Sequence, residues 1–234
     1  SRWRKRWRKK RKNLKKIDRI RKCSSEKSYA EAAGEAAGIL KAGGIVAYPT
    51  RCLYGLGADA LSREAVNRVF AVKQRSPDNP LLILVPDRDA VNTLVKKVSQ
   101  DAVKMMDRFW PGRVTIVFPA STRLPANLHA GKNKIGIRLP GHPLARALVN
   151  AFGGPITGTS ANRSGHAAAS RIQDLDPAMV EKLDLILDAG QLQGGTGSTV
   201  VDVTGETVAV LREGGVSRAE IFNALKQSPT FPSV

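Results

Sequence analysis

Apolar runs of five or six residues alternate with amphipathic segments along most of the chain. The segment from Ser28 to the Gly43-Gly44 pair has helical periodicity, and Ser28 with Glu31 three residues later predicts a capping box at its start. The run IVAYP after these glycines predicts a buried strand. A second helix is predicted to start at Ser62 and to end before Pro77, because proline cannot continue a helix.

The same alternation continues to the end of the chain. Further strands are predicted over 81–85, 114–118, 134–139, 155–159, 184–188, 198–203 and 207–211, and further helices over 99–109, 144–151, 177–183 and from Ser217. Apolar strands interleaved with helices predict an α/β fold whose sheet is covered on both faces. The last two strands flank Thr204-Gly205-Glu206, which predicts an antiparallel hairpin and therefore a mixed sheet.

Positive charge is concentrated at the N-terminus. The 234 residues carry a net charge of +18, and residues 1–22 hold 14 Lys and Arg against one Asp. We therefore expect a basic N-terminal extension over 1–27 and one catalytic domain over 28–234. Trp3, Trp7, Leu14 and Ile17 fall within about 80° on a helical wheel, which suits a basic amphipathic helix that binds RNA phosphates, an acidic partner or a membrane surface. A solvated run of charge is the alternative.

Several classes of protein and site are excluded by composition. No stretch reaches the roughly 18 apolar residues of a membrane span, and no apolar region follows the charged N-terminus as in a secretory signal. Cys23 and Cys52 form no CxxC pair, so we expect a reducing cytoplasm. The three histidines lack partners at metal-ligand spacing, so no protein metal site is expected.

Glycine-rich loops point to a phosphate ligand without a standard nucleotide motif. GGTGST (194–199) lacks the Lys of a P-loop and runs into a strand. GLGADA (55–60) matches G-x-G-x-x-A, but the acidic residue expected about 20 residues later is misplaced. These loops, together with TRCLY, KQRSPDN, GIRLPGHP, TGTSANRSG and VLREGG, adjoin predicted strand ends and carry hydroxyls and isolated cations. They favour a polyanion such as a nucleotide, with no obvious general base.

Lys73 and Arg75 raise two interpretations. They stand at the predicted end of the helix that starts at Ser62, where cations stabilise the helix by about 0.3–1 kcal/mol each through its dipole. They also stand at the entrance of the strand over 81–85, where a phosphate ligand would bind. The local sequence alone leaves both open.

Taken in order, these motifs resemble those of the YrdC family, the threonylcarbamoyl-AMP synthases of tRNA modification. The resemblance covers about 29–216 and rests on Lys73-Gln-Arg75, on Ser160-Ala-Asn162 and on the runs LYGLGADA, NPLLILV, FWPGRVTIVF, IRLPGHPL, TSANRSG, GSTVVDV and LREGGVS. It implies an α/β fold with a twisted mixed sheet around a concave basic cavity. It also implies a nucleotidyltransferase that forms threonylcarbamoyl-AMP and pyrophosphate from L-threonine, bicarbonate or CO2, and ATP with Mg2+. Its partner would be the threonylcarbamoyl transferase complex that modifies tRNA.

The resemblance also implies a role for individual residues. The catalytic and triphosphate-binding residues would be Lys73 and Arg75, joined on the nucleotide by Asn79, Ser160, Asn162 and Arg212. The threonine site would be formed by Thr50, Tyr54, Arg138 and Ser198, with the Arg138 guanidinium on the carboxylate.

The chain departs from the family pattern at three positions. Cys52 stands where Thr is frequent, Leu84 where some members have His, and Ala168 where a hydroxyl is expected. Since the chain ends at Val234, we expect no additional C-terminal domain. A non-catalytic protein of the same fold that binds double-stranded RNA or tRNA through this cavity and the basic extension is the alternative function.

Overall fold

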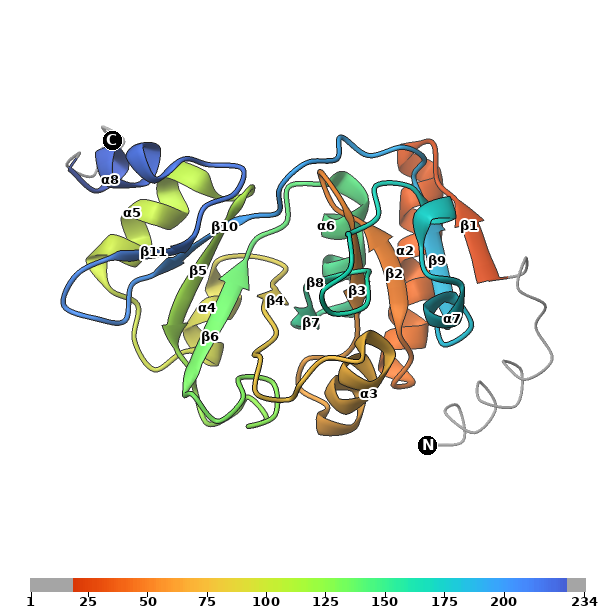
Figure 1. Ribbon diagram of the computed structural model, residues 1–234, viewed down its shortest axis with the longest axis horizontal. Helices are drawn as coiled ribbons and strands as arrows, with labels where there is room; N and C mark the ends of the chain where they lie inside the picture. The colour runs from red at the N-terminus through yellow and green to blue at the C-terminus, as the bar shows by residue number, and fades with distance from the viewer. Residues whose placement is uncertain (1–18, 227–234) are drawn as a thin grey trace.

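The computed structural model describes residues 19–226 and contains two mixed β-sheets that lie side by side (Figure 1). The five-stranded sheet has the order β1-β9-β2-β3-β8, and the six-stranded sheet has the order β11-β10-β5-β6-β4-β7. The strands are β1 Ile20–Lys22, β2 Val46–Pro49, β3 Tyr54–Gly57, β4 Ile83–Leu84, β5 Val114–Pro119, β6 Lys134–Arg138, β7 Ile156–Thr157, β8 Thr159–Ser160, β9 Leu185–Asp188, β10 Thr199–Asp202 and β11 Ala209–Arg212. The predicted α/β class and mixed pairing are confirmed, with the strands divided between two sheets.

The two sheets are joined where one predicted strand divides. Within 155–159, β7 pairs with β4 in the six-stranded sheet and β8 pairs with β3 in the five-stranded sheet, so the chain passes between sheets at Gly158. A Cβ at Gly158 would lie 2.4 Å from Cδ1 of Leu82, which explains the glycine at this crossing. The predicted hairpin is also confirmed, because β10 and β11 are antiparallel.

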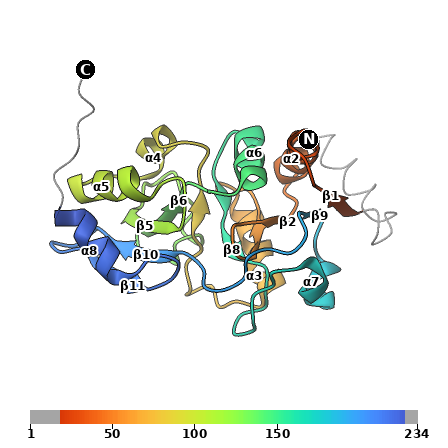
Figure 2. The same ribbon diagram turned by 90° about the horizontal axis from the view of Figure 1, so that it is seen from above.

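Helices cover both faces of the five-stranded sheet, with α2 and α6 on one side and α3 and α7 on the other (Figure 2). The helices are α2 Glu26–Lys41, α3 Arg63–Lys73, α4 Asp89–Leu94, α5 Gln100–Phe109, α6 Pro143–Phe152, α7 Pro177–Val180 and α8 Arg218–Lys226, with a 3-10 turn η2 over Ile172–Asp174. The core between α2, α6 and β2 includes Leu40, Tyr48, Leu148 and Leu187. Within residues 19–226, no helix is both long enough and apolar enough to cross a lipid bilayer.

Helix starts follow the expected capping chemistry, with one correction. Ser62 and Ser99 cap α3 and α5, and each side chain accepts from the backbone N–H three residues later. For α2, however, Ser25 is the N-cap and Ser28 occupies the third helical position, where it completes the capping box. The predicted start was wrong because either serine can serve as a cap, and Ser25 allows one more turn to form.

Three other elements differ from the prediction. Strand β1 pairs in parallel with β9, so the folded domain begins within the range 1–27 that we assigned to the extension. Arg21 reinforces this by contacting both carboxylate oxygens of Glu35 on α2, at 2.7 and 2.8 Å. The segment over Tyr54–Gly57, expected as a loop, is the fully buried strand β3, and the short helix α4 was not predicted. Most of the basic extension lies outside the described residues.

Candidate active site

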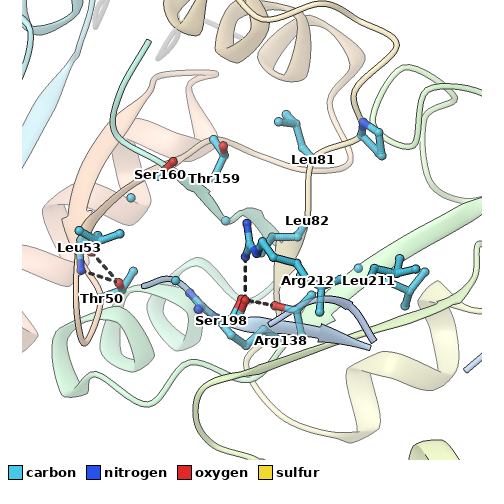
Figure 3. A pocket seen from close by; sticks show the side chains of 18 of the residues that line it. Thr50, Leu53, Leu81, Leu82, Arg138, Thr159, Ser160, Ser198, Leu211 and Arg212 are labelled. Atoms are coloured by element: carbon cyan, nitrogen blue, oxygen red, sulfur yellow. Dashed lines mark hydrogen bonds between the residues drawn. The ribbon is translucent and has the colours of Figure 1, made fainter. Parts of the chain in front are cut away.

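A cavity of about 570 Å³ opens between the two sheets. One wall comes from β3 and β8, and the other from β5, β6, β10 and β11 (Figure 3). Of the ten residues expected in the site, seven line it: Thr50, Tyr54, Arg75, Arg138, Ser160, Ser198 and Arg212. Its volume lies within the range of about 300–1,000 Å³ typical of small-molecule sites.

Positive charge dominates the lining of the large cavity. Five cationic side chains line it, from Arg75, Lys132, Lys134, Arg138 and Arg212, whereas Asp202 is the one carboxylate in the described lining. Asp202 already accepts from Lys134 at 2.9 Å and from the Thr204 hydroxyl at 2.6 Å. The remaining guanidinium groups therefore have no acidic partner in the cavity wall, which favours an anionic ligand.

Arg75 and Arg212 approach the cavity from the two sides. The Arg75 Nε and Nη2 donate to the carbonyls of Asn79 and Pro80 at 3.1 and 3.0 Å, so the side chain is fixed against its own loop. Arg212 donates to the Ser198 carbonyl at 2.8 Å. Burial, and secondarily the charge of Arg212, lower the pKa of Arg75. The two like charges are thus close enough to repel, and an anion between them would remove this repulsion.

Arg138 lies at the end of β6, and its side chain is half-buried. Its Nε is buried and has no hydrogen-bond partner among the described residues. Burial lowers the pKa of Arg138, as does the charge of Arg212 to a smaller extent, while Tyr48 opposes the change. A buried N–H donor without a partner is costly, and a ligand carboxylate is the group that the planar fork of a guanidinium fits best.

Lys73 was expected to contact the triphosphate, but its side chain is buried beside the large cavity and not in its lining. It is 1% exposed and does not line the large cavity. Its Nζ donates to the carbonyls of Ser160 and Asn162 and, at 3.3 Å, to Oδ1 of Asn162. The Ser160 hydroxyl donates to the same Oδ1 at 2.5 Å. Lys73 therefore fixes the turn that presents Ser160 to the cavity.

Asn162 and Asn79 also lie outside the lining of the large cavity. The Asn162 side chain is used within the turn, since its Nδ2 donates to the carbonyl of His166 at 2.5 Å. Asn79 is exposed, and its carbonyl accepts from Arg75. In this conformation both residues hold the loops that carry Ser160 and Arg75.

The buried residue Thr199 lies between Ser198 and the loop that follows Arg212. The Thr199 hydroxyl donates to the Val216 carbonyl and accepts from the N–H groups of Gly214 and Val216 at 2.9 and 3.1 Å. All its hydrogen-bonding capacity is used to join the start of β10 to the loop after β11. A Cβ at Gly214 would lie 2.3 Å from the Gly197 carbonyl oxygen, so the two loops are in direct contact.

The hydroxyls of Thr50, Tyr54 and Ser198 are already partnered. Thr50 donates to the Leu53 carbonyl at 2.5 Å, and the Ser198 and Thr115 hydroxyls share a 2.7 Å hydrogen bond (Figure 3). The Tyr54 hydroxyl donates to the Gly190 carbonyl at 2.8 Å and accepts from Ala189 N–H. Thr50 and Ser198 retain acceptor capacity toward a ligand, whereas the Tyr54 hydroxyl is directed to the 189–190 loop.

The three departures from the family pattern differ in position. Ala168 lines the large cavity, Cys52 lines a smaller adjoining cavity, and Leu84 is fully buried outside both linings. Five residues that were not predicted in the site also line the large cavity: Thr115, Lys132, Lys134, Gly158 and Asp202. Both lysines stand in the run GKNKIG, which leads into a predicted strand. Ligands of α/β proteins usually bind at loops that follow strands, so this run was not expected in the site.

The chain is similar to known proteins over most of its length. The family model Sua5/YciO/YrdC, described as telomere recombination, matches residues 38–214. The chain belongs to the Sua5/YciO/YrdC family. A threonylcarbamoyl-AMP synthase of Pyrococcus abyssi is 35% identical over 199 residues, covering 85% of this chain and 58% of that protein. A putative threonylcarbamoyl-AMP synthase of Mycobacterium tuberculosis is 33% identical over 203 residues, covering 87% of this chain and 93% of that protein.

A solved structure supports the same family fold. The crystal structure of Pyrococcus abyssi Sua5 complexed with L-threonine superposes with a TM-score of 0.80 at 33% identity, covering 88% of this chain and 61% of that one. The chain thus spans less than two thirds of the archaeal family member's length. What the two proteins share is the domain that contains the large cavity.

Proposed function

We propose that the protein is an L-threonylcarbamoyladenylate synthase, a nucleotidyltransferase that forms threonylcarbamoyl-AMP and pyrophosphate from L-threonine, bicarbonate and ATP. The observation that carries this proposal is the meeting of Arg75, Arg138 and Arg212 in one cavity with a single, already paired carboxylate in its described lining. Two of these substrates would present anionic groups there, the triphosphate of ATP and the carboxylate of threonine. The names of the relatives support the same reaction.

In this proposal the amino acid binds first at Arg138. The threonine carboxylate accepts from the Arg138 guanidinium, which supplies the partner that the buried Nε lacks. The amine becomes a carbamate, and the carbamate oxygen attacks the α-phosphorus of ATP while pyrophosphate leaves from the opposite side. Because both reactants are anions, the chief contribution of the protein is to hold them together and to balance their charge.

Arg75 and Arg212 balance the charge that develops on the pyrophosphate. Both guanidinium groups line the large cavity and are held by backbone carbonyls, so little side-chain reorganisation is needed when the triphosphate binds. Ser160, fixed by Lys73 through the 160–162 turn, adds a nucleotide contact. Lys73 and Asn162 act in this scheme by positioning that turn. Asn79 acts by holding Arg75, since its backbone carbonyl accepts a hydrogen bond from the Arg75 Nε.

Magnesium enters as part of the MgATP substrate. Mg2+ prefers oxygen ligands and retains several waters. Asp202 is the one carboxylate in the described lining of the large cavity, and it is paired with Lys134. The ligands of the ion would therefore be phosphate oxygens and water. It would screen the charge of the leaving pyrophosphate.

The product would pass to a threonylcarbamoyl transferase complex that modifies tRNA. The alternative in which the cavity itself binds duplex RNA is disfavoured by size, since about 570 Å³ accommodates a nucleotide and an amino acid but not a helix of RNA.

Pyrophosphate release tests the proposal directly. With MgATP and bicarbonate we expect release to depend on L-threonine and to stop when bicarbonate is removed. Mass spectrometry should detect threonylcarbamoyl-AMP in the same reaction. Pyrophosphate release that is indifferent to threonine, or the absence of any release from a folded protein, would contradict the synthase assignment.

A further inference from the structure

Thr115 is a polar residue in an otherwise apolar strand. It belongs to β5, where Val114, Ile116 and Phe118 are part of the hydrophobic core. Thr115 itself is 1% exposed and, unlike these three residues, lines the large cavity. The proposed function gives it no contact with ATP or threonine. A buried hydroxyl in the wall of a binding site therefore needs a separate explanation.

Strand pairing places Thr115 between two residues expected in the threonine site. On one side β10 runs parallel to β5 and begins directly after Ser198. On the other side Ile116 pairs with Ile137 of β6, and one step further along this antiparallel register brings Thr115 across from Arg138. Residues directly opposite each other in a sheet lie on the same face. The face that lines the large cavity thus carries Thr115 between Ser198 and Arg138.

The Thr115 hydroxyl is hydrogen-bonded to the hydroxyl of Ser198, with 2.7 Å between the two oxygens (Figure 3). Ser198 is 4% exposed, so both members of the pair are buried. Each hydroxyl carries one hydrogen, and either oxygen can be the donor of the shared bond. One hydrogen of the pair therefore remains without an acceptor among residues 19–226. A buried donor of this kind is costly unless a ligand accepts from it.

Packing against β6 fixes the direction of the Thr115 hydroxyl. A Cβ at Gly136 would lie 3.0 Å from Cγ2 of Thr115, so the methyl group packs closely over this glycine. Threonine is stiff about χ1 because its Cβ is branched. With the methyl group held toward β6, the hydroxyl is held toward β10 and Ser198. Valine at position 115 would keep the shape and the methyl contact but would leave Ser198 without its partner.

A carboxylate on Arg138 would select one of the two arrangements of the hydroxyl pair. Carboxylate oxygens accept hydrogen bonds and donate none, so they require the free hydrogen of the pair. Ser198 lines both cavities, as Arg138 does, whereas Thr115 lines the large cavity alone. Ser198 is therefore the better placed donor to this ligand. Thr115 must then donate to Ser198, which holds the serine side chain in one rotamer and polarises its O–H bond.

We propose that Thr115 is a positioning residue of the threonine site, which donates to Ser198 and so directs the Ser198 hydroxyl to the carboxylate of threonine. The inference rests on the proposed function and adds to it a residue that acts through another. Because its hydroxyl is directed to Ser198, Thr115 should affect the binding of the amino acid and not that of ATP. A cross-strand pair of hydroxyls that only stabilises the sheet is the alternative.

Substitution of Thr115 tests this role. The KM for threonine is measured from pyrophosphate release at saturating MgATP and bicarbonate. We expect Thr115→Val to raise it about 3- to 10-fold, the range that corresponds to loss of one hydrogen bond. Thr115→Ser keeps the hydroxyl and should stay within about twofold of the wild type, as should the KM for ATP in both variants. A KM for threonine that is equal in the wild type and Thr115→Val would refute the inference.

A double variant separates positioning from packing. If Thr115 acts through Ser198, Thr115→Val should raise the KM for threonine in the wild type but not further in a Ser198→Ala protein. If Thr115 acts by packing or by touching threonine directly, the same substitution should raise the KM by an equal factor in both backgrounds. Equal factors would therefore contradict the positioning role.

Thr157→Val is the matched control for the loss of a buried hydroxyl. Thr157 is fully buried and lies outside both cavity linings, and its hydroxyl donates to the Leu56 carbonyl at 3.0 Å. We expect this variant to melt at a lower temperature and to keep the KM for threonine of the wild type. If it raised that KM as much as Thr115→Val does, reduced stability would explain both results and the inference would fail.

A binding measurement separates this inference from the proposed function. Titration calorimetry with L-threonine alone should show a lower affinity for Thr115→Val and a recovered affinity for Thr115→Ser, and it requires no turnover. This pattern in a protein that releases no pyrophosphate would retain the positioning role and remove the synthase assignment. Threonine-dependent release, with equal threonine affinity for the wild type and Thr115→Val, would do the reverse.

Discussion

Arg75 combines contacts that hold its own loop with a position in the lining of the large cavity. Its Nε and Nη2 hold the carbonyls of the following loop, and the group also lines the large cavity. We expect Arg75→Ala to weaken ATP binding by about 1.5–3 kcal/mol, the contribution of a hydrogen bond to a charged group. Titration calorimetry with ATP measures this. Arg63→Ala, at the exposed start of the same helix, is the matched control and should leave ATP affinity unchanged.

We expect Lys73 to make nucleotide use sensitive to pH. Burial, with a smaller effect from the charge of Arg75, lowers the pKa of Lys73 to about 8. Below this pH the ammonium can donate to all three of its oxygen acceptors, and above it the neutral amine can donate to at most two. The 160–162 turn should therefore be held less firmly in alkaline solution.

The expected result is a fall in kcat/KM for ATP as the pH rises through about 8. An arginine side chain remains protonated well above pH 8, so a folded Lys73→Arg variant should lack this step, whatever its activity at neutral pH. Thermal melting over the same pH range controls for unfolding. An identical step in both proteins would assign the titration to another group.

At the scale of elements, Gly55 and Gly57 explain both the position of β3 and the failure to predict it. A Cβ at either residue would lie 3.1 Å from the Tyr48 ring of the neighbouring strand β2. Gly57→Ala should thus destabilise the protein by about 1–3 kcal/mol through overpacking. Gly34→Ala is the matched control, because a Cβ there meets nothing within 4 Å and should stabilise α2 by about 0.5–1 kcal/mol. Denaturant unfolding should give a lower free energy of unfolding for Gly57→Ala than for the wild type, and a higher one for Gly34→Ala.

Such packing limits what the sequence predicts. Ser62 and Ser99 fixed helix starts because capping is local, and the helices α3 and α5 were located correctly. The glycines in YGLG instead predicted a loop. The structure explains them by the close approach of the Tyr48 ring from the neighbouring strand, which the local sequence does not reveal. Strand β1 was missed for the same kind of cause: its partner β9 lies more than 160 residues away in the chain. The periodicity of apolar residues within a short segment does not reveal contacts with residues so far away in the chain.

Thr199 couples two elements that carry the site. Its hydroxyl joins the first residue of β10 to the loop after β11; Ser198 directly precedes Thr199, and Arg212 is the last residue of β11. Thr199→Val keeps the shape but leaves the buried Val216 N–H, the part-buried Gly214 N–H and the Val216 carbonyl without their partner, at a cost of about 1–3 kcal/mol in unfolding free energy. We expect a raised KM for ATP as Arg212 is displaced. Thr199→Ser, which keeps the hydroxyl, should restore both quantities toward wild type, whereas a purely steric role would make serine the worse substitution.

At the scale of the whole molecule, the sequence predicted which loops carry the site better than it predicted what each residue does there. Seven of the ten expected residues line the large cavity because several loops in the prediction do meet between the two sheets. Lys73, Asn79 and Asn162 fall outside the lining because Lys73 makes a long-range contact to the 160–162 turn and the two asparagines make local contacts four residues away, and a motif encodes neither. The residue types of a site are thus easier to infer than the division between ligand contact and support.

The basic extension leads to the last prediction. Residues 1–18 lie outside the described part of the chain and contain 11 of the 38 Lys and Arg residues, while every side chain of the two cavities lies beyond residue 49. We propose that this extension recruits tRNA. Removal of residues 1–18 keeps β1 and should leave threonine-dependent pyrophosphate release unchanged. The affinity for tRNA should fall, and the slope of log affinity against log salt should flatten by about 0.7–0.9 for each phosphate that the extension neutralises. Gel-shift titrations at several salt concentrations measure that slope, and equal slopes for the full-length and shortened proteins would show that the extension binds no phosphates.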